Sequence, residues 1–457
     1  MPNAASDTDL LIVGAGPTGL AAACDALRHG LTVRIVERRA TRSEYSKALV
    51  LHARTLEVLE VLGCANELVA AGQRFSALNV RTSTTARPLR VDLLKRGWGD
   101  TRYPFWLSIP QYEVERILEA RLAALGGVIE WSTELTSLDD RGDHVVAKLS
   151  ASSGEVLGHS ARWVLGCDGG RSATREQLGV ALTRQDVGVT FALADVHTTS
   201  ELVEDEGHVV LSSEGVLLIV PMPERGLWRL IAQVPQQAEL VSPADWNGLV
   251  QRRAGIELGI HRLGWTSKFD LTSGVADRFR KGNVFLLGDA AHVHSPVGGQ
   301  GLNTGVQDAH NLVWKLALLK KGLSSELSAA LLDSYESERQ PIARQMVRGT
   351  SIATRLLTVT NPVVRWVRGR FARLLLSRAR VQDQLARGVG MLDLETAGLR
   401  RLPNPVLPAG DRLHDRVDPR VPTLLQWQGR DVMVRPDRIL ARPGSLPTQL
   451  AITARGA

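Results

Sequence analysis

Cysteine is scarce in this 457-residue chain, and long apolar runs are absent. The three cysteines, Cys24, Cys64 and Cys167, form no CxxC pair, and an odd number cannot all pair with one another. A disulfide framework is therefore not expected, and a reducing compartment such as the cytoplasm fits best. No run reaches about 18 uncharged apolar residues, and no basic segment opens the chain. We therefore expect neither a transmembrane helix nor a signal peptide.

Several catalytic signatures are also missing. The chain contains no GxSxG, HExxH or GxxxxGK[ST] motif, so the usual sequence evidence for a serine hydrolase, a zinc protease or a P-loop nucleotidase is lacking. His292 and His294 lie two residues apart near Asp289, but a metal site needs more ligands at a better spacing. We expect these histidines to pack and to form hydrogen bonds, and we predict no metal.

The excess positive charge is confined to one segment. The net charge is +7, and residues 362–390 hold seven arginines against the single acid Asp383. The rest of the chain is nearly neutral, which argues against a nucleic-acid partner. Apolar residues of the segment fall on one helical face, which predicts a packed helix with a solvated basic face. A helix lying on a membrane surface is the alternative.

The periodicity of apolar residues predicts both helices and strands. Residues 111–125 place apolar side chains on one helical face, and 302–320 and 325–357 are also predicted to be helices. Between about 185 and 272, short strands follow one another with turn signals between them, which predicts an antiparallel sheet. After residue 400 proline is frequent and periodicity is weak.

A glycine-rich turn near the start of the chain carries the first chemical signal. Gly14, Gly16 and Gly19 form GxGxxG after the apolar strand 9–13 and open a helix. Gly14 permits the turn, Gly16 lets the backbone approach a pyrophosphate, and Gly19 allows close packing of helix on strand. The helix N-terminus offers N–H groups to phosphates. Glu37 ends the next strand, where it can accept a hydrogen bond from a ribose hydroxyl. Because its charge would repel a 2′-phosphate, FAD or NAD is expected rather than NADP.

Two further motifs follow predicted strands. GDAAHVHSPVGGQGLNTGVQDAHNLVWKL (288–316) places Asp289 where it can bind a polyol chain, and glycines where backbone can approach a flat ring. The helix after this loop points its positive end at the loop, which suits the negative charge that a flavin gains on reduction. CDGGRSATR (167–175) places Asp168 at a strand end, with Arg175 expected to hold its carboxylate.

Together these stretches resemble the FAD-dependent aromatic hydroxylases. These are single-component monooxygenases of the p-hydroxybenzoate hydroxylase class, and the likeness is to the branch acting on polyketides, rifampicin and other large phenols. It runs from about residue 8 to 400 and includes KALVLHARTLEVLE and IPQYEVERIL. It implies an α/β fold with four parts: a Rossmann-like FAD-binding domain (1–184), an inserted antiparallel-sheet substrate domain (185–275, also drawing on about 75–110), a return of the FAD-binding domain with helices (276–400), and a contracted thioredoxin-like tail (401–457).

The resemblance also implies cofactor contacts position by position. The pyrophosphate is expected at the glycine turn, the adenosine at the end of the second strand, and the flavin beside the third motif. The implied cofactor residues are Gly14, Gly16, Pro17, Thr18 and Gly19 at the pyrophosphate, Glu37 and Arg38 at the adenosine, Lys47 and Arg54 as basic groups near the phosphates and the mobile flavin, Gln111 and Asp289 at the ribityl chain, Asp168 serving both FAD and the nicotinamide cofactor, and Pro296, Gly299, Leu302 and Asn303 at the isoalloxazine ring.

The implied reaction is hydroxylation of a phenolic or polyketide-like aromatic substrate, with antibiotic biosynthesis or modification as its setting. NADPH or NADH reduces the flavin, dioxygen forms a C4a-hydroperoxide, and one oxygen atom passes to an electron-rich ring carbon. Because the flavin carries this chemistry, no side chain is assigned as a catalytic acid or base. The alternatives are Baeyer–Villiger or epoxidising chemistry on the same scaffold, and a flavin-binding accessory protein without productive oxygenase activity. The expected partners are the substrate and O₂, without nucleic acid or stable membrane insertion, in a monomer or homodimer.

The tail departs from the family pattern. Polyketide-type relatives usually end in a longer thioredoxin-like domain, of which GRDVMVRPDRIL (429–440) resembles the final strands. No cysteine follows Cys167, so thiol redox chemistry is not expected in the tail.

Overall fold

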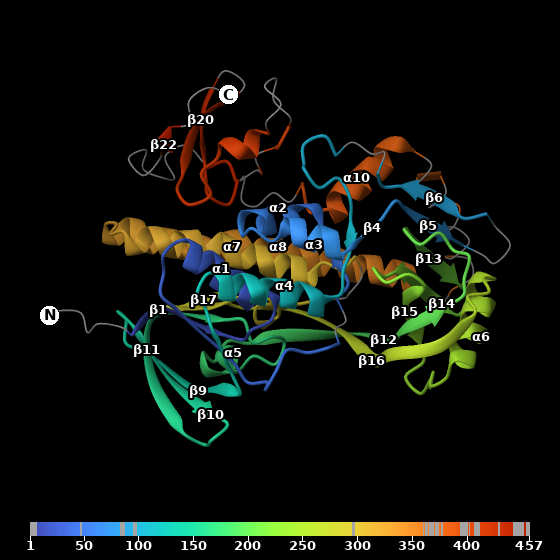
Figure 1. Ribbon diagram of the computed structural model, residues 1–457, viewed down its shortest axis with the longest axis horizontal. Coiled ribbons are helices and arrows are strands. Elements are labelled where there is room, and N and C mark those ends of the chain that lie inside the picture. The colour runs from blue at the N-terminus through green and yellow to red at the C-terminus, as the bar shows by residue number, and fades with distance from the viewer. Residues whose placement is uncertain are drawn as a thin grey trace.

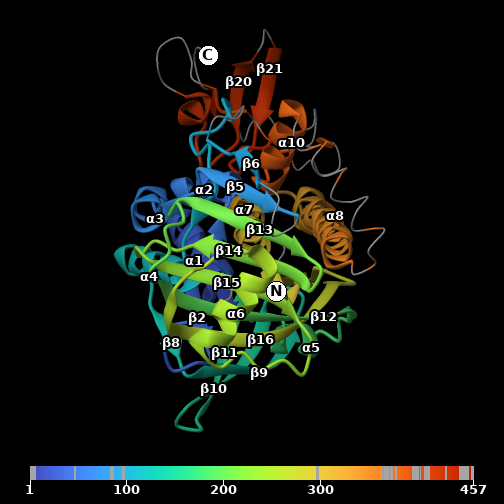
Figure 2. The same cartoon turned by 90° about the vertical axis from the view of Figure 1, so that its right-hand side faces the viewer.

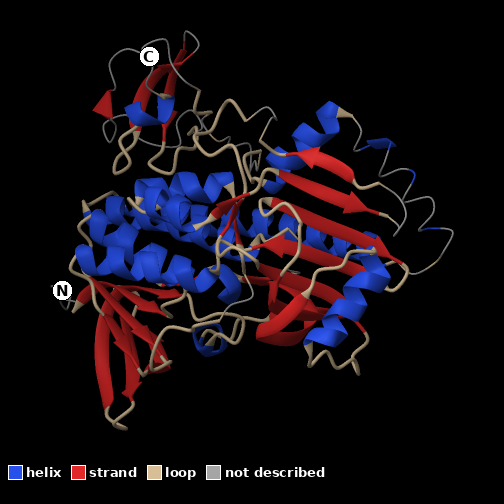
Figure 3. Ribbon diagram, turned by 45° about the vertical axis from the view of Figure 1, so that its right-hand side comes forward, coloured by secondary structure: helices blue, strands red, loops and turns tan. Residues whose placement is uncertain are grey.

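Two eight-stranded sheets and a layer of long helices make up most of the computed structural model, and a small unit from the end of the chain lies beyond the helices (Figures 1 and 3). The mixed α/β class predicted from the sequence is confirmed. The structure describes residues 7–45, 48–82, 87–94, 98–294, 298–359, 361, 364, 370, 374–375, 378–393, 401, 403–405, 412–427, 430–441 and 452–453.

The first sheet is built around the apolar strand at the start of the chain. Its order is β17 (Arg280–Lys281), β18 (Val284–Leu286), β11 (Val156–Gly166), β1 (Thr8–Val13), β2 (Val33–Glu37) and β8 (Ile129–Trp131), with the hairpin of β9 (Thr133–Asp140) and β10 (Val145–Ala151) continuing from β11. The pairs from β18 to β8 are parallel. Leu10, Leu11 and Ile12 are fully buried, because a parallel strand with both faces covered needs an uninterrupted apolar run.

Helices beside the first sheet bring the three motifs toward one another. The helices of the described chain are α1 (Pro17–Arg28), α2 (Ala53–Val61), α3 (Ala65–Ala71), α4 (Gln111–Ala124), α5 (Ala173–Gln177), α6 (Pro243–Ala254), α7 (Gly301–Lys320), α8 (Ser325–Thr358) and α10 (Ala379–Val389). Helix α1 packs against both α4 and α7, and α7 also contacts α2 and α8. The predicted helices 111–125, 302–320 and 325–357 are confirmed as α4, α7 and α8.

The second sheet is antiparallel except where β13 meets β5. Its order is β19 (His292–Val293), β16 (Ile260–Ala276), β12 (Leu182–Thr198), β15 (Leu227–Val234), β14 (Gly215–Pro221), β13 (Glu206–Ser212), β5 (Ala77–Arg81) and β6 (Leu89–Asp92). One face forms a core with Trp246 and Leu249 of α6. Successive residues of a strand alternate between faces, so Ala194 belongs to that core while Leu193 and Asp195 lie on the opposite face.

The C-terminal unit is joined to the helices by buried charges. The short elements of this region and of the connections are β20 (Thr423–Trp427), β21 (Arg430–Val434), β22 (Ile452–Thr453), the 3-10 turn η2 (Leu413–Arg416), and a small sheet of β3 (Val50–Leu51), β7 (Leu107–Ser108) and β4 (Gln73–Arg74). Figure 2 shows β20 and β21 at one end of the molecule, beyond α2. Arg435 pairs with Glu338 of α8 at 2.8 Å, and Arg401 pairs with Glu57 of α2.

Two expectations concern parts of the chain that are described only in part. Within the arginine-rich segment 362–390, residues 362–363, 365–369, 371–373 and 376–377 lie outside the described residues, and the structure describes α10 as a helix. The strands β20 and β21 form an antiparallel hairpin where the sequence resembles the end of a thioredoxin-like domain. The thioredoxin-like character of the tail and the division into four parts stay predictions.

Candidate functional site

The glycine turn has the geometry that its three glycines predict. Gly14 has a φ of +103°, and a Cβ at this position would lie 2.5 Å from the carbonyl oxygen of Cys167. A Cβ on Gly19 would overlap the carbonyl oxygen of Gly14. A Cβ on Gly16 would meet nothing within 4 Å. The turn role of Gly14 and the packing role of Gly19 are therefore confirmed, while Gly16 leaves open space in front of the N-terminus of α1.

Glu37, the last residue of β2, binds the backbone of the glycine turn through its carboxylate. Its carboxylate accepts hydrogen bonds from the backbone N–H of Ala15 at 2.9 Å and from the N–H and Nε of Arg39 at 3.0 Å each. Burial disfavours the charge, but these hydrogen bonds outweigh it and lower the pKa of Glu37 below its usual range. The carboxylate keeps further lone pairs, so it can also accept from a ribose hydroxyl.

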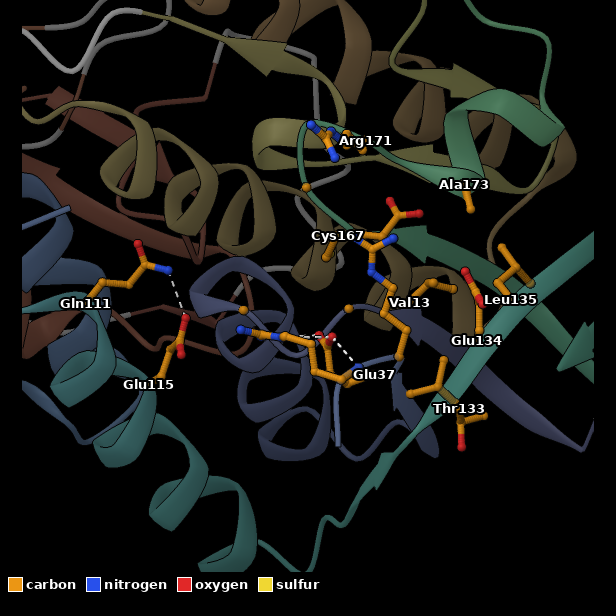
Figure 4. A pocket seen from close by; sticks show the side chains of 17 residues that line it. Val13, Glu37, Gln111, Glu115, Thr133, Glu134, Leu135, Cys167, Arg171 and Ala173 are labelled. Carbon is orange, nitrogen blue, oxygen red and sulfur yellow. Dashed lines mark hydrogen bonds and ion pairs between the residues drawn. The ribbon is translucent and has the colours of Figure 1, made fainter. Parts of the chain in front are cut away.

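One cavity of about 290 Å³ joins the glycine turn to the CDGGRSATR motif (Figure 4). Its walls come from the glycine turn, the ends of β2 and β11, the first turns of α4 and α5, and the start of β9. An extended ligand that contacts the glycine turn can therefore also reach α4. The cavity brings together six of the predicted cofactor residues: Gly14, Gly16, Glu37, Arg38, Gln111 and Asp168.

Asp168 is held by the start of α5, not by the arginine expected from the sequence. Its carboxylate accepts hydrogen bonds from the hydroxyl of Ser172 at 2.5 Å and from the N–H and hydroxyl of Thr174 at 2.9 and 3.0 Å. Arg175 instead donates to the carbonyl oxygens of Ala290 and Gly170, at 3.0 Å each. The expectation for Arg175 was wrong because the helix N-terminus and its hydroxyls satisfy the carboxylate first.

Gln111 begins α4 and lies at one side of the cavity. Its side-chain Nε2 donates to Oε1 of Glu115, one helical turn later, at 2.8 Å. Burial raises the pKa of Glu115 above its usual range, against the opposing effects of this hydrogen bond and of Arg39. Glu115 was not predicted, although its spacing of four residues from Gln111 places both on one face of the helix.

The third motif forms a loop that is fastened to the segment before α2. Asp289 lies in the 3-10 turn η1 (Gly288–Ala290) with an exposed side chain. The side-chain amide of Asn303 donates to the carbonyl oxygens of Val50 and Gly299, at 2.8 and 2.7 Å. Its Oδ1 accepts from the N–H of His52 at 2.9 Å. Because these bonds use both amide hydrogens of Asn303, this residue fixes the position of the loop.

The structure does not bring every predicted cofactor residue to the cavity. Arg54 pairs with Glu57 of its own helix α2 at 3.0 Å and donates to the carbonyl oxygen of Asp437, in the C-terminal unit, at 2.5 Å. Glu57 and the carbonyl oxygen of Asp437 thus hold its guanidinium group, and Arg54 does not line the cavity. Its expected place near the phosphates and the mobile flavin stays a prediction. Lys47 and Pro296 lie outside the described residues.

The remaining predicted residues lie close to the turn or the loop. Pro17 is the first residue of α1, and Gly16 is its N-cap. Thr18 contacts the backbone of the third motif, since a Cβ on Gly288 would lie 2.7 Å from its hydroxyl. Leu302 is partly buried against the main core. Gly299 has a φ of +63°, which a side chain would strain.

A buried ion network joins the third motif to Arg339 of α8 and was missed by sequence reasoning. Asp308 accepts from His292 at 2.7 Å, from the N–H of Gly288 at 3.1 Å and from Arg339 at 2.6 Å. Burial opposes ionisation of Asp308, but Arg339 and His292 outweigh it and lower its pKa. The hydrogen bond expected for His292 is confirmed. An acid within the buried helix α7 was the sequence signal for this network.

The face of the second sheet opposite α6 carries a buried ion pair. Arg229 donates to both carboxylate oxygens of Asp195, at 2.7 and 2.8 Å, from neighbouring strands. Arg229 also donates to the carbonyl oxygen of Ala48, two residues before the segment that Asn303 fixes, at 3.4 Å. The polar pair therefore lies where the second sheet meets the loop before β3.

Comparison with known proteins places the chain in a family. A family model described as FAD binding domain matches residues 7–350. The chain belongs to this family. The matched range includes the glycine turn, the CDGGRS motif and the third motif, and the resemblance to FAD-dependent aromatic hydroxylases is confirmed. Within the described ranges, no helix combines the length and apolar character needed to cross a bilayer, and no three His, Cys, Asp or Glu residues gather as metal ligands would.

Relatives of this FAD binding domain protein include named monooxygenases. The 6-methylpretetramide 4-monooxygenase of Streptomyces rimosus is 36% identical over 367 residues, which span 79% of this chain and 64% of that protein. The rifampicin monooxygenase of Rhodococcus hoagii is 29% identical over 495 residues, which span 97% and 96%. The anhydrotetracycline hydroxylase structure from Streptomyces rimosus superposes with a TM-score of 0.76 at 29% identity over 95% of each chain. The chain thus spans less than two thirds of the length of the first of these relatives.

Proposed function

We propose that this protein is an FAD-dependent monooxygenase that hydroxylates a phenolic or polyketide-like aromatic compound with NADPH or NADH and O₂. The observation that carries the proposal is the single cavity in which the glycine turn, Glu37, Gln111 and Asp168 meet. The names of the relatives support the reaction class, since they include a 6-methylpretetramide 4-monooxygenase, a rifampicin monooxygenase and an anhydrotetracycline hydroxylase.

The residues around the cavity fit the parts of FAD. Gly16 leaves room for a pyrophosphate at the N-terminus of α1, where no side chain caps the first turn. Glu37 is placed to accept from the adenosine ribose, and Gln111 is placed to reach the ribityl chain. When bound, the flavin supplies the transfer of electrons from NAD(P)H to dioxygen. The protein positions the rings and excludes water.

We place the substrate against the face of the second sheet that lies opposite α6. Leu193 and Ile231 provide apolar contact on this face, and the Arg229–Asp195 pair provides polar groups. Arg229 contacts Ala48, just before the segment that Asn303 fixes, so this face borders the loop of the third motif. An aromatic substrate with polar substituents fits such a surface, because apolar walls hold the ring and few polar groups orient it.

The test is an assay of NADPH and NADH consumption by the FAD-loaded protein with a panel of phenols and polyketides, with hydrogen peroxide measured in parallel. Substrate-stimulated consumption with little peroxide and a hydroxylated product is the expected result. Ester or epoxide products would instead assign Baeyer–Villiger or epoxidising chemistry. Bound FAD with slow consumption that no aromatic compound stimulates would contradict the proposal and favour an accessory flavoprotein.

A further inference from the structure

Glu115 is a buried carboxyl group at the proposed cofactor cavity that none of the motifs explains. Its side chain lines the cavity, yet the residue is only 2% exposed. Oε1 accepts the hydrogen bond from Gln111, and Oε2 has no hydrogen-bond partner among the described residues. Leaving a buried carboxyl oxygen unpaired costs stability, so a role at the cavity accounts better for Glu115 than packing does.

The chemistry of a carboxylate fixes the orientation of the neighbouring amide. In the structure the NH₂ group of Gln111 faces Glu115, which is the orientation that an ionised carboxylate requires because it only accepts hydrogen bonds. The amide carbonyl oxygen, Oε1 of Gln111, is then turned away from Glu115. Figure 4 shows this arrangement, with the amide nitrogen on the dashed line to Glu115 and the oxygen on the other side. No described residue donates to this oxygen.

An acceptor at this position discriminates between parts of a dinucleotide. Phosphate oxygens are acceptors and gain nothing from a carbonyl oxygen. The hydroxyl groups of the ribityl chain and of the ribose are donors and match it. With the amide reversed, the NH₂ group would face the cavity and would suit a phosphate instead. The orientation of Gln111 therefore decides which part of FAD it binds.

We propose that Glu115 is a positioning residue that holds the Gln111 amide with its carbonyl oxygen toward the cavity, where it accepts a hydrogen bond from a sugar-chain hydroxyl of FAD. The inference rests on the placement of FAD proposed above. Glu115 acts through Gln111, so removing either residue removes the same interaction. Replacing both residues should therefore weaken FAD binding little more than replacing either one alone.

A double-mutant cycle on FAD affinity tests this coupling. The variants are Glu115→Leu, Gln111→Leu and the two together, with the FAD dissociation constant measured by flavin fluorescence and the melting temperature of each apoprotein measured alongside. Each single variant is expected to weaken FAD binding about ten-fold, the usual effect of losing one hydrogen bond of this kind. The double variant is expected to bind as weakly as the single variants. A loss of about a hundred-fold in the double variant would show independent effects and overturn the proposal.

Conservative replacement separates positioning from packing. Glu115→Gln keeps a carbonyl acceptor for the NH₂ of Gln111, so it should weaken FAD binding by no more than about three-fold. An equal loss in Glu115→Gln and Glu115→Leu would contradict the proposal. Glu113→Gln is the matched control, since Glu113 lies on the same helix and pairs with Arg116 at the surface. Glu115→Ala replaces the leucine variant, with the same expected loss, if that variant does not fold.

The cycle also distinguishes this inference from the proposed placement of FAD. If Gln111→Leu binds FAD as the unaltered protein does, then the cofactor does not reach Gln111 and both proposals fail. If Gln111→Leu weakens binding while Glu115→Leu does not, the placement stands and only the role of Glu115 is refuted.

Discussion

Gly16→Ala should weaken FAD binding and Gly19→Ala should destabilise the fold, although the two glycines are only three residues apart. A methyl group on Gly19 overlaps the carbonyl oxygen of Gly14, so α1 must move away from the turn. A methyl group on Gly16 meets no protein atom within 4 Å, and the φ of −76° at Gly16 is accessible to alanine. The first substitution therefore strains the fold, and the second only occupies space that we assign to the pyrophosphate.

The expected magnitudes follow from these contacts. Overpacking a close contact costs about 1–3 kcal/mol, and 1 kcal/mol shifts the melting temperature of a domain of about 150–250 residues by roughly 2–4 °C. Gly19→Ala should therefore lower the melting temperature of the apoprotein by roughly 5 °C. Gly16→Ala should destabilise the fold by less than about 1 kcal/mol, because alanine is a poorer N-cap residue than glycine. It should weaken FAD binding at least about ten-fold, or about 1.4 kcal/mol.

The assay is a thermal melt of both apoproteins together with a fluorescence titration of FAD. Equal melting temperatures for the two variants would refute the packing argument for Gly19. Unchanged FAD affinity in Gly16→Ala would refute the placement of the pyrophosphate.

Three further predictions concern other parts of the molecule. Asp289→Ala should lower FAD affinity sharply without changing the melting temperature of the apoprotein, because the side chain is exposed; unchanged flavin content would remove Asp289 from the site. Burial lowers the pKa of His29, His52 and His208 from 6.5 to about 4, so the unfolded chain binds protons first and the stability of the fold should fall as the pH drops from about 6.5 toward 4. Melting temperatures measured across that range check the sign, and a smaller fall in His52→Gln is expected. Arg435→Met removes a buried guanidinium group that pairs with Glu338 of α8 and with Asp437, although Glu338 keeps its pair with Lys315, and breaking these buried pairs should cost about 3–5 kcal/mol; a melting temperature equal to that of the unaltered protein would show that the tail does not brace the helices.

Much of the structure of the glycine turn can be predicted from the sequence, because its physical requirements are local. Only glycine fits at Gly14 and Gly19, where backbone oxygen atoms approach, and the strand, turn and helix around them lie within about thirty residues. The apolar run of β1 predicts a buried parallel strand for the same reason. Helices α4 and α8 also follow from periodicity, since each buries one face, whereas α7 is buried on all sides from Asn303 to Leu319.

The parts that sequence reasoning missed depend on contacts between distant segments. Arg54 is directed to the tail by Asp437, which is 383 positions away, and no local pattern indicates this pairing. Arg175 was expected at Asp168, but Ser172 and Thr174 reach the carboxylate first. The order of hydrogen-bond partners in a turn depends on backbone angles that spacing alone does not determine.

Oxygen incorporation tests the central claim most directly. The FAD-loaded protein would be given NADPH or NADH, the aromatic compound that best stimulates consumption, and ¹⁸O-labelled dioxygen, and the product would be examined by mass spectrometry. A ring hydroxyl carrying one labelled atom, with the second atom released as water, is the predicted result. A product labelled only from solvent water, or consumption of dioxygen that yields only peroxide with every compound tried, would contradict a monooxygenase.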